Sequence, residues 1–206
     1  MRPGLFDNNS SQLRQAYLNM LPRLRNENDI PDTSLASEHF FDSSVLEELR
    51  KGLGLPFCKE EVKASGSRTS GAVLVEFHDI SPLPVVERQL FELQTAGYIP
   101  VIAHPERYRS VWEKPEIMER LVDLGSVTLL DTAALAGKYG RRSKASARKL
   151  LQLGLYDAAC SDAHRPEDVS LVEKGMKWIR SEYGPDEINL LFHETPTRLL
   201  EGKRPI

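Results

Sequence analysis

The chain has 206 residues, of which 40% are hydrophobic, and its formal net charge is -3. This length and apolar content can bury a substantial core, which predicts one domain over residues 1–206. Without a basic excess, the composition argues against a nucleic-acid partner and gives no reason to expect binding to an anionic membrane. No run approaches 18 apolar residues, so membrane insertion is not expected. Two cysteines are too few for a disulfide framework, and a reducing, cytoplasmic compartment is expected.

The first third of the chain predicts two helices, one weak strand and a long loop. Apolar residues spaced three and four apart predict an amphipathic helix over residues 10–25, with Asn9 or Ser10 as its N-cap. A weak strand over residues 34–37 leads to Glu38, and a second helix follows through residues 45–49. Residues 54–71 are rich in Pro, Gly, Ser, Lys and Glu, which predicts an exposed loop.

From residue 72 onward, strand and helix patterns alternate. The predicted strands cover residues 72–77, 99–103, 126–130 and 155–160, and the predicted helices cover residues 82–96, 114–124 and 141–153. The tail is predicted to be helical over residues 167–183, from 185 onward, and near 196–201. Repeated β-α units of this size predict an α/β fold with a parallel sheet, open or closed into a barrel, and with sites at the carboxyl ends of the strands.

Two apolar runs end in residues that bind metals or anions. The run over residues 99–103 is followed by His104, and the run over residues 155–160 is followed by Asp162 and His164. Buried parallel strands present ligands in this way, and imidazole with carboxylate suits manganese, iron or zinc. His104 alone would more often be a core histidine, but the Asp-x-His pair after a second strand favours a metal site. Glu38 is either a bridging carboxylate of that site or a surface residue.

Basic residues occur at two places near these motifs. Arg107 lies three residues after His104, where its guanidinium either holds a phosphate bidentately or pairs with Glu106. Arg141, Arg142 and Lys144 open a predicted helix, and a solvated basic face is expected there rather than an anion site at the helix N-terminus.

Neither cysteine can be the nucleophile of a cysteine-based phosphatase. That loop needs an arginine six positions after the cysteine, but Cys58 is followed there by Ala64 and Cys160 by Pro166. A Gly-x-Ser-x-Gly elbow and a Gly-x-x-x-x-Gly-Lys phosphate loop are also absent from the sequence. A hydrolase built from these residues would therefore attack with metal-activated water.

Several stretches resemble the bacterial manganese-dependent tyrosine-protein phosphatases of the CpsB/YwqE type, which belong to the polymerase and histidinol phosphatase (PHP) superfamily. The stretches are Ala103-His104-Pro105-Glu106-Arg107-Tyr108, Ser161-Asp162-Ala163-His164, Leu74-Val75-Glu76, Gly97-Tyr98-Ile99-Pro100-Val101 and Leu135-Ala136-Gly137-Lys138-Tyr139-Gly140. The resemblance covers nearly the whole chain and implies a single PHP-like domain, a distorted (β/α)7 barrel with a two- or three-metal centre that hydrolyses phosphotyrosine.

The resemblance also implies roles for individual residues. Glu38, His104, Asp162 and His164 match family metal ligands, and Arg107 matches a residue that binds the substrate phosphate. His104 and Arg107 are therefore the expected catalytic residues. The implied cofactor is a divalent metal, manganese first, with iron or zinc as alternatives. The implied partner is a phosphotyrosine protein, typically the tyrosine autokinase that controls capsular or extracellular polysaccharide synthesis.

The sequence departs from the family pattern at its start. The family opens with a strand carrying Asp-x-His-x-His and a second strand ending in Thr-Pro-His, whereas residues 1–8 resemble the stretch that follows them. The first two β-α elements are therefore expected to be absent, which leaves about five parallel strands. A barrel lacking strands exposes sheet edges, so a homo-oligomer is expected. Leu129 also stands where the family usually has Gln.

Two alternatives to the phosphotyrosine phosphatase stay open. One is a catalytically inactive PHP remnant or interaction module that keeps the kinase-docking surface. The other is a related hydrolase of a small phosphate ester, similar to a histidinol phosphatase.

Overall fold

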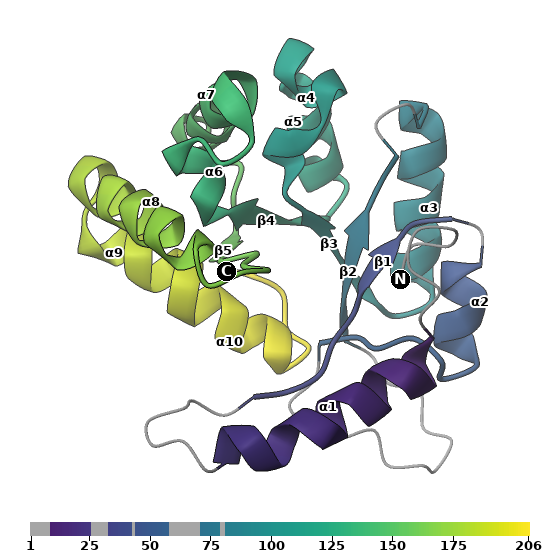
Figure 1. Cartoon of the computed structure of the whole chain (residues 1–206). Helices are drawn as coiled ribbons and strands as arrows, with labels where there is room; N and C mark the ends of the chain where they lie inside the picture. The colour runs from purple at the N-terminus through teal and green to yellow at the C-terminus, as the bar shows by residue number, and fades with distance from the viewer. Residues whose placement is uncertain (1–8, 26–32, 43, 58–70, 79–80) are drawn as a thin grey trace.

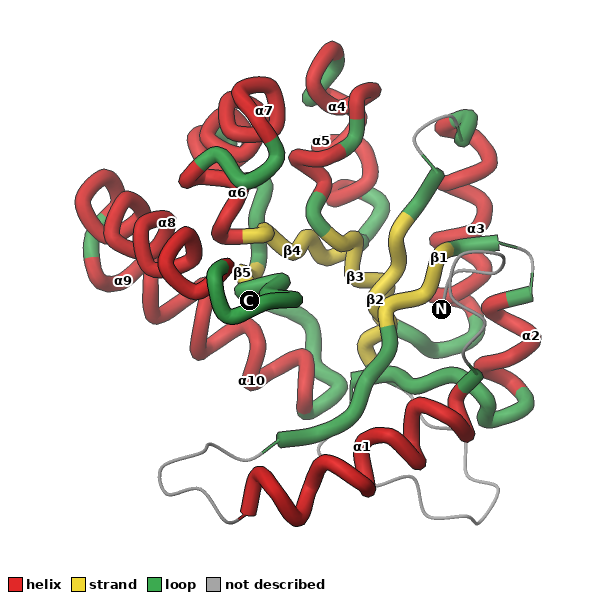
Figure 2. The backbone as a smooth tube through the Cα atoms, viewed as in Figure 1, coloured by secondary structure: helices red, strands yellow, loops and turns green. Residues whose placement is uncertain are grey.

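The fold is centred on one parallel sheet. A computed structural model describes residues 9–25, 33–42, 44–57, 71–78 and 81–206. In these residues, five parallel strands are ordered β1-β2-β3-β4-β5 (Figures 1 and 2). The strands are β1 (Glu38–Phe40), β2 (Ala72–Glu76), β3 (Ile99–Ala103), β4 (Val127–Asp131) and β5 (Ala158–Cys160). Strand order that follows chain order is typical of β/α barrels, whereas doubly wound sheets reverse it.

Helices of varied length surround this sheet, so the predicted α/β fold of about five parallel strands is confirmed. They are α1 (Ser10–Arg25), α2 (Val45–Arg50), α3 (Leu83–Thr95), α4 (Arg109–Glu113), α5 (Glu116–Asp123), α6 (Thr132–Ala136), α7 (Gly140–Gln152), α8 (Asp168–Tyr183), α9 (Pro185–Asn189) and α10 (Thr195–Leu200). Two short turns, η1 (Pro105–Arg107) and η2 (Leu190–Glu194), complete the set. No helix in the described part of the chain is long and apolar enough to cross a membrane.

The structure corrects one predicted strand, adds two short helices and leaves one predicted loop mostly untested. The weak strand predicted over residues 34–37 begins later, at Glu38, so Glu38 lies inside β1 rather than after it. Helices α4 and α6 were not predicted. Most of the loop predicted over residues 54–71 lies outside the described residues.

The predicted N-cap of the first helix is confirmed at Asn9. Its side-chain oxygen accepts the backbone N–H of Gln12 at 3.0 Å, and the Gln12 side chain accepts the backbone N–H of Asn9 at 3.0 Å. This reciprocal pair satisfies two N–H groups that would otherwise lack partners at the start of a helix.

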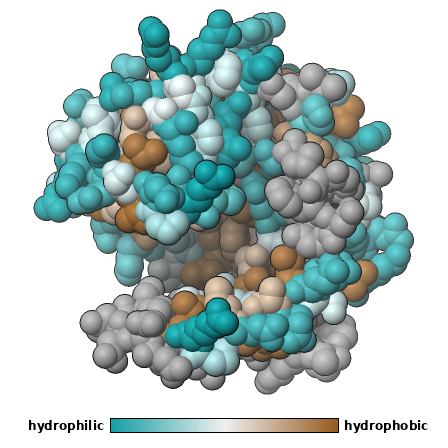
Figure 3. Space-filling view, viewed as in Figure 1, coloured by the Kyte–Doolittle hydropathy of each residue, from teal (hydrophilic) through white to brown (hydrophobic). Residues whose placement is uncertain are grey.

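The two faces of the sheet bury different clusters. Alternate strand residues such as Val73, Val75 and Ile102 join the larger core, together with residues of the helices around the sheet. The residues between them, Ala72 and Val101 among them, form a smaller cluster with Leu199 of α10. Figure 3 shows a hollow with apolar colouring between α1 and the rest of the molecule. Glu76 shares the face of the smaller cluster, so the polar ends of the strands open on this inner side.

Gly175 allows α8 to lie directly against α6. A Cβ atom at this position would overlap the carbonyl oxygen and side chain of Thr132. Gly175→Ala is therefore expected to lower the free energy of unfolding by about 1–3 kcal/mol, although alanine is the better helix former. Denaturant unfolding measures the difference. Lys174→Ala, on the exposed side of the same helix, is the control and should unfold as the wild type does. A stable Gly175→Ala variant would contradict the close packing.

Candidate metal centre and phosphate site

Three side chains from neighbouring strands converge at the carboxyl end of the sheet. Glu38 of β1, Glu76 of β2 and His104, which follows β3, each offer one ligand atom within 4.8 Å of the other two. His104 Nε2 lies 2.9 Å from Glu38 Oε1. A divalent ion with bonds of about 2.0–2.2 Å separates its ligand atoms by about 3–4.4 Å. Two carboxylates and an imidazole suit manganese, iron or zinc, so these residues fit a divalent metal.

The backbone at both ligand motifs is left-handed. His104 has φ 34° and Asp162 has φ 40°, and they are the non-glycine residues with positive φ in the described part of the chain. Such a conformation costs about 1–3 kcal/mol in a non-glycine residue and is concentrated at functional sites. Both turns direct the chain sharply away from the strand that precedes them, which leaves the His104 and Asp162 side chains at the strand ends.

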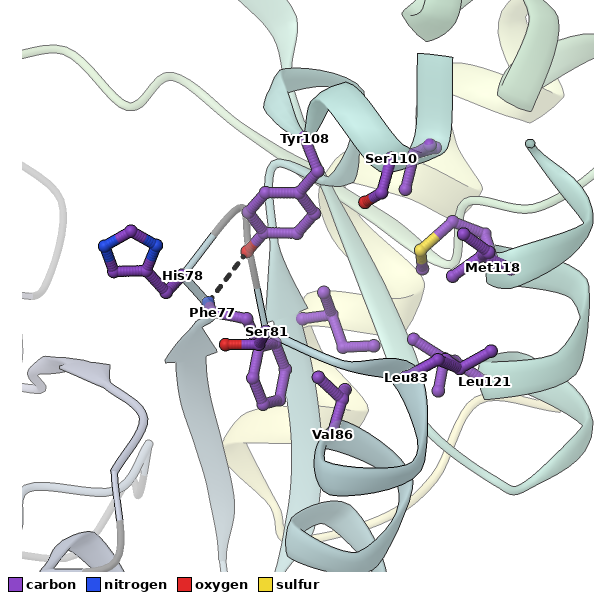
Figure 4. Close-up of a pocket in the computed structure, with 12 residues that line it drawn as sticks. Phe77, His78, Ser81, Leu83, Val86, Tyr108, Ser110, Met118 and Leu121 are labelled. Atoms are coloured by element: carbon purple, nitrogen blue, oxygen red, sulfur yellow. Dashed lines mark hydrogen bonds between the residues drawn. The ribbon is translucent and has the colours of Figure 1, made fainter. Parts of the chain in front are cut away.

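Tyr108 joins the ends of the two central strands. Its hydroxyl accepts the backbone N–H of Phe77 at 3.2 Å (Figure 4) and donates to the carbonyl oxygen of Ala103 at 3.0 Å. Burial raises the pKa of Tyr108 far above its ordinary value, so the hydroxyl stays a donor. Because Phe77 follows Glu76 and Ala103 precedes His104, these bonds set the spacing of two candidate ligands.

The same tyrosine closes one end of a small pocket of about 110 Å³. Apolar side chains from α3 and α5, including Val86 and Met118, form most of its lining (Figure 4). The pocket lies on the helix side of the sheet, because Ile102 and Val86 of its lining belong to the larger core. The pocket is therefore part of the apolar packing next to Phe77, the residue after Glu76, and it is not the reaction site.

The Glu38 and His104 side chains shift each other's protonation. Burial acts to raise the pKa of Glu38, but the hydrogen bond and charge of His104, with the charge of Arg107, lower it overall. Burial acts to lower the pKa of His104, but the hydrogen bond to Glu38 raises it overall. The pair therefore favours an ionised carboxylate facing a protonated imidazole, and the imidazole must release this proton before its nitrogen can bind a cation.

Arg107 lies between the two groups of predicted ligands. Its Nη1 atom donates to Asp162 Oδ2 at 3.1 Å, and its guanidinium carbon lies 4.4 Å from the centre of the Tyr139 ring. The Tyr139 hydroxyl donates to the same Asp162 oxygen at 3.3 Å. The alternative pairing of Arg107 with Glu106 is not found, because the Glu106 carboxyl accepts other donors. A stacked and hydrogen-bonded guanidinium is held in one orientation, with further N–H groups available to an anion.

The loop after β5 carries Asp162 and His164 and is anchored by Lys138. The Lys138 ammonium donates to the Asp162 carbonyl oxygen and to Asp168 Oδ2, both at 3.1 Å. Asp168 Oδ2 also accepts the backbone N–H of His164 at 3.0 Å. The His164 side chain is 74% exposed. Among the described residues, neither Asp162 nor His164 belongs to the group within 4.8 Å of His104. The four predicted ligands thus form two groups, and their action as one set stays a prediction.

Comparison with known proteins places the chain in a family. The family model for capsular polysaccharide synthesis, CpsB/CapC, matches residues 2–201. This chain belongs to the CpsB/CapC family.

Individual members of the CpsB/CapC family show how far the similarity extends. Tyrosine-protein phosphatase YwqE of Bacillus subtilis is 33% identical over 133 residues, which cover 64% of this chain and 52% of YwqE. The putative tyrosine-protein phosphatase CapC of Staphylococcus aureus is 29% identical over 154 residues, which cover 68% of this chain and 59% of CapC. Tyrosine-protein phosphatase CpsB of Streptococcus pneumoniae is 22% identical over 205 residues, with 97% of this chain and 80% of CpsB covered. The chain thus spans little more than half the length of the first two relatives.

A solved structure from the family has the same fold. It comes from a study of YwqE from Bacillus subtilis and CpsB from Streptococcus pneumoniae, which are described as unique metal-dependent tyrosine phosphatases. The match has a TM-score of 0.80 and 27% identity, and it covers 100% of this chain and 82% of that chain. The α/β architecture predicted from the sequence therefore matches that of a solved family member.

Two residues of the candidate site, Glu76 and Tyr139, were not predicted from the sequence. Glu76 is the last residue of β2 and the only charged residue in that strand, which was the available signal. Tyr139 lies in a Gly-rich loop, and its contact with Arg107 depends on packing between segments 32 residues apart. The strand-end rule that identified His104 applies equally to Glu76.

Glu106 connects the candidate phosphate residue to the next strand. Its carboxyl is fully buried, accepts the backbone N–H of Asp131 at 3.0 Å and accepts the Tyr156 hydroxyl at 2.8 Å. Burial raises the pKa of Glu106 to about 7, against an ordinary value of 4.5. The folded chain therefore holds this carboxyl neutral at pH values where the unfolded chain ionises it.

A Glu106→Gln variant tests this protonation state. An acid with a raised folded pKa stabilises the fold fully below its unfolded pKa, and the contribution is lost as pH rises from 4.5 to about 7. Relative to the glutamine variant, the wild type should therefore lose about 3 kcal/mol of unfolding free energy across this range. Calorimetry of both proteins in chelator, at half-unit pH steps, measures the difference. Parallel pH profiles would show that Glu106 titrates normally.

Proposed function

We propose that the chain is a single PHP-like domain over residues 1–206 that acts as a metal-dependent protein-tyrosine phosphatase. The observation that carries the proposal is the meeting of Glu38, Glu76 and His104 within one coordination-sized space. Family membership supports it, because relatives are named tyrosine-protein phosphatases. The specific chemistry of this chain follows from the residues at the site.

In the proposed mechanism, Glu38, Glu76 and His104 hold a divalent ion, with manganese as the first choice and iron or zinc as alternatives. When bound, such an ion supplies Lewis-acid activation of water and of a phosphoryl oxygen. We propose that Asp162 and His164 would bind a further ion, so each of the two groups of ligands would hold its own metal ion. The exposed His164 imidazole faces solvent, where a substrate arrives.

Arg107 is the proposed phosphate-binding residue. Asp162 and the Tyr139 ring fix its guanidinium, so its remaining N–H groups present a planar pair of donors to phosphate oxygens. The donors keep their orientation before substrate arrives, and little reorganisation is needed as charge develops in the transition state. Arg107 and His104 are thus the proposed catalytic residues.

We further propose a bacterial tyrosine autokinase of capsular or extracellular polysaccharide synthesis as the phosphotyrosine protein. The family's description in capsular polysaccharide synthesis supports this substrate class. A cytoplasmic location is proposed with it, where the free thiol of Cys160 would stay reduced. Self-association through β1 or β5, the edges of the described sheet, is also proposed.

Hydrolysis of a phosphotyrosine peptide with manganese, before and after chelator treatment, tests the function. Histidinol phosphate is assayed in parallel. Metal-dependent activity that prefers the phosphotyrosine peptide is the expected result. A preference for histidinol phosphate would favour the small-ester hydrolase. Folded, manganese-binding protein that hydrolyses neither compound would favour the interaction module, and it would overturn the phosphatase proposal.

A further inference from the structure

A basic groove lies between α4 and α7, outside the site described above. It has a volume of about 550 Å³, and its lining includes Arg109, Trp112, Glu113, Arg142, Ser146 and Lys149. The two helices lie side by side in Figures 1 and 2, and both pack against η1. With three basic side chains and one acidic side chain, the groove is positive although the whole chain has a net charge of -3.

The α7 side of the groove carries a row of side chains on one helix face. Arg142, Ser146 and Lys149 are spaced four and three residues apart, so they point to the same side of the helix. Arg142 and Lys149 are exposed, and neither forms an ion pair with any described residue. Seven residues of helix separate their Cα atoms by about 10 Å along the axis. Two cations this far apart suit an extended anionic chain better than a single phosphate ion.

The groove begins beside the candidate phosphate residue. Arg107 ends η1, and α4 starts two residues later at Arg109. Tyr139, whose ring lies 4.4 Å from the Arg107 guanidinium, directly precedes α7. Both helices that form the groove therefore begin within two residues of a side chain at the candidate phosphate site.

We propose that this groove binds an acidic segment next to the phosphotyrosine of the substrate protein. The inference rests on the proposed phosphatase function and adds a specificity determinant to it. An extended peptide rises about 3.3 Å per residue, so carboxylates three residues apart match the separation of Arg142 and Lys149. Trp112 forms part of the groove wall, and its indole N–H donates to the Glu106 carbonyl oxygen at 2.6 Å. Its fixed ring is a fluorescent reporter of an occupied groove.

The test compares two adjacent arginines. Arg142→Glu reverses a charge inside the groove, whereas Arg141→Glu makes the same change at an exposed α7 residue outside the lining. Three substrates are assayed: a phosphotyrosine peptide with Asp and Glu neighbours, its Asn and Gln counterpart, and 4-nitrophenyl phosphate. Binding of the acidic peptide without phosphate is followed by tryptophan fluorescence in a Trp178→Phe background, where Trp112 is the one tryptophan left, so this measurement does not require catalysis.

The wild type is expected to prefer the acidic peptide about tenfold in kcat/KM, through KM, and to lose this preference at high salt. Arg142→Glu should remove the preference and weaken binding of the unphosphorylated acidic peptide about tenfold, with 4-nitrophenyl phosphate hydrolysis unchanged. Arg141→Glu should behave as the wild type does. Lys149→Glu repeats the test if Arg142→Glu does not fold.

Other outcomes overturn the inference. A wild type that treats both peptides equally does not use the groove for acidic segments, and equal losses in the two arginine variants would reflect net charge alone. A wild type without activity on any aryl phosphate would defeat the proposed function only. The peptide-binding measurement then tests separately whether the groove binds an acidic segment, and absence of binding in that measurement refutes the inference.

Discussion

A His104→Ala variant is expected to lose manganese-dependent phosphotyrosine hydrolysis by about two orders of magnitude or more and to bind manganese about 10–100-fold more weakly. His104 is the buried member of the candidate ligand group, and its Nε2 atom lies 2.9 Å from Glu38. Its removal takes away one candidate metal ligand and also the hydrogen bond that lowers the pKa of Glu38. The Glu38 pKa should then be less strongly lowered, because burial is opposed by fewer favourable contacts, and a protonated carboxyl is a poorer metal ligand.

Manganese titration calorimetry and activity assays on the same preparation measure both effects. His193→Ala is the matched control, because it removes an exposed histidine on η2, outside the candidate group. Glu76→Gln should weaken manganese binding in the same direction as His104→Ala, since Glu76 is the third member of the group. Unchanged manganese affinity in a folded His104→Ala protein would show that the metal binds elsewhere.

The sequence predicts the strands well because four of them are apolar runs bounded by turn residues. The fully buried β3 and the mostly buried β4 lie where the apolar runs predict them. β1 was misplaced because three residues carry almost no periodicity. Its position is set by pairing with β2, where Phe40 lies opposite Glu76. This register places Glu38 opposite Leu74, two residues before Glu76 on the same strand face, and the side chains of the two glutamates then approach within 4.8 Å.

The short helices could not be recognised from periodicity either. α4 and α6 have five residues each, little more than one turn, so their patterns contain no repeat. Their ends are fixed by local contacts instead. Asp131 accepts the Ala133 N–H at the start of α6, and Gly137 takes φ 96° at its end. The structure shows these contacts, but an aspartate and a glycine at this spacing are equally common in loops, so the sequence does not predict a helix between them.

The grouping of the candidate ligands depends on side-chain pairing that the motifs do not encode. The sequence places His104, Asp162 and His164 at strand ends, and the structure confirms that each follows a strand. The sequence does not predict that Arg107 donates a hydrogen bond to Asp162 and lies between the two groups of candidate ligands. Motif spacing therefore locates the edge of the sheet that carries the site, whereas packing between distant segments decides which residues share an ion.

An Arg107→Ala variant is expected to lower kcat/KM for a phosphotyrosine peptide by about 10²–10³-fold, with manganese affinity close to that of the wild type. The guanidinium is the proposed hydrogen-bond donor to the substrate phosphate, but it is not a metal ligand. Arg107→Lys should recover little of the activity, because an ammonium has neither the planar pair of N–H groups nor the stacking surface that faces Tyr139 at 4.4 Å.

Tyr139→Phe is the matched control for the Arg107 variants. It keeps the ring against the guanidinium and removes only the hydroxyl that donates to Asp162 at 3.3 Å. Its kcat/KM should stay within about threefold of the wild type, the loss of one weak hydrogen bond. Steady-state kinetics and manganese titrations on all three variants separate phosphate binding from metal binding. If Arg107→Ala loses manganese affinity in step with activity, Arg107 supports the metal centre through Asp162 rather than holding the phosphate.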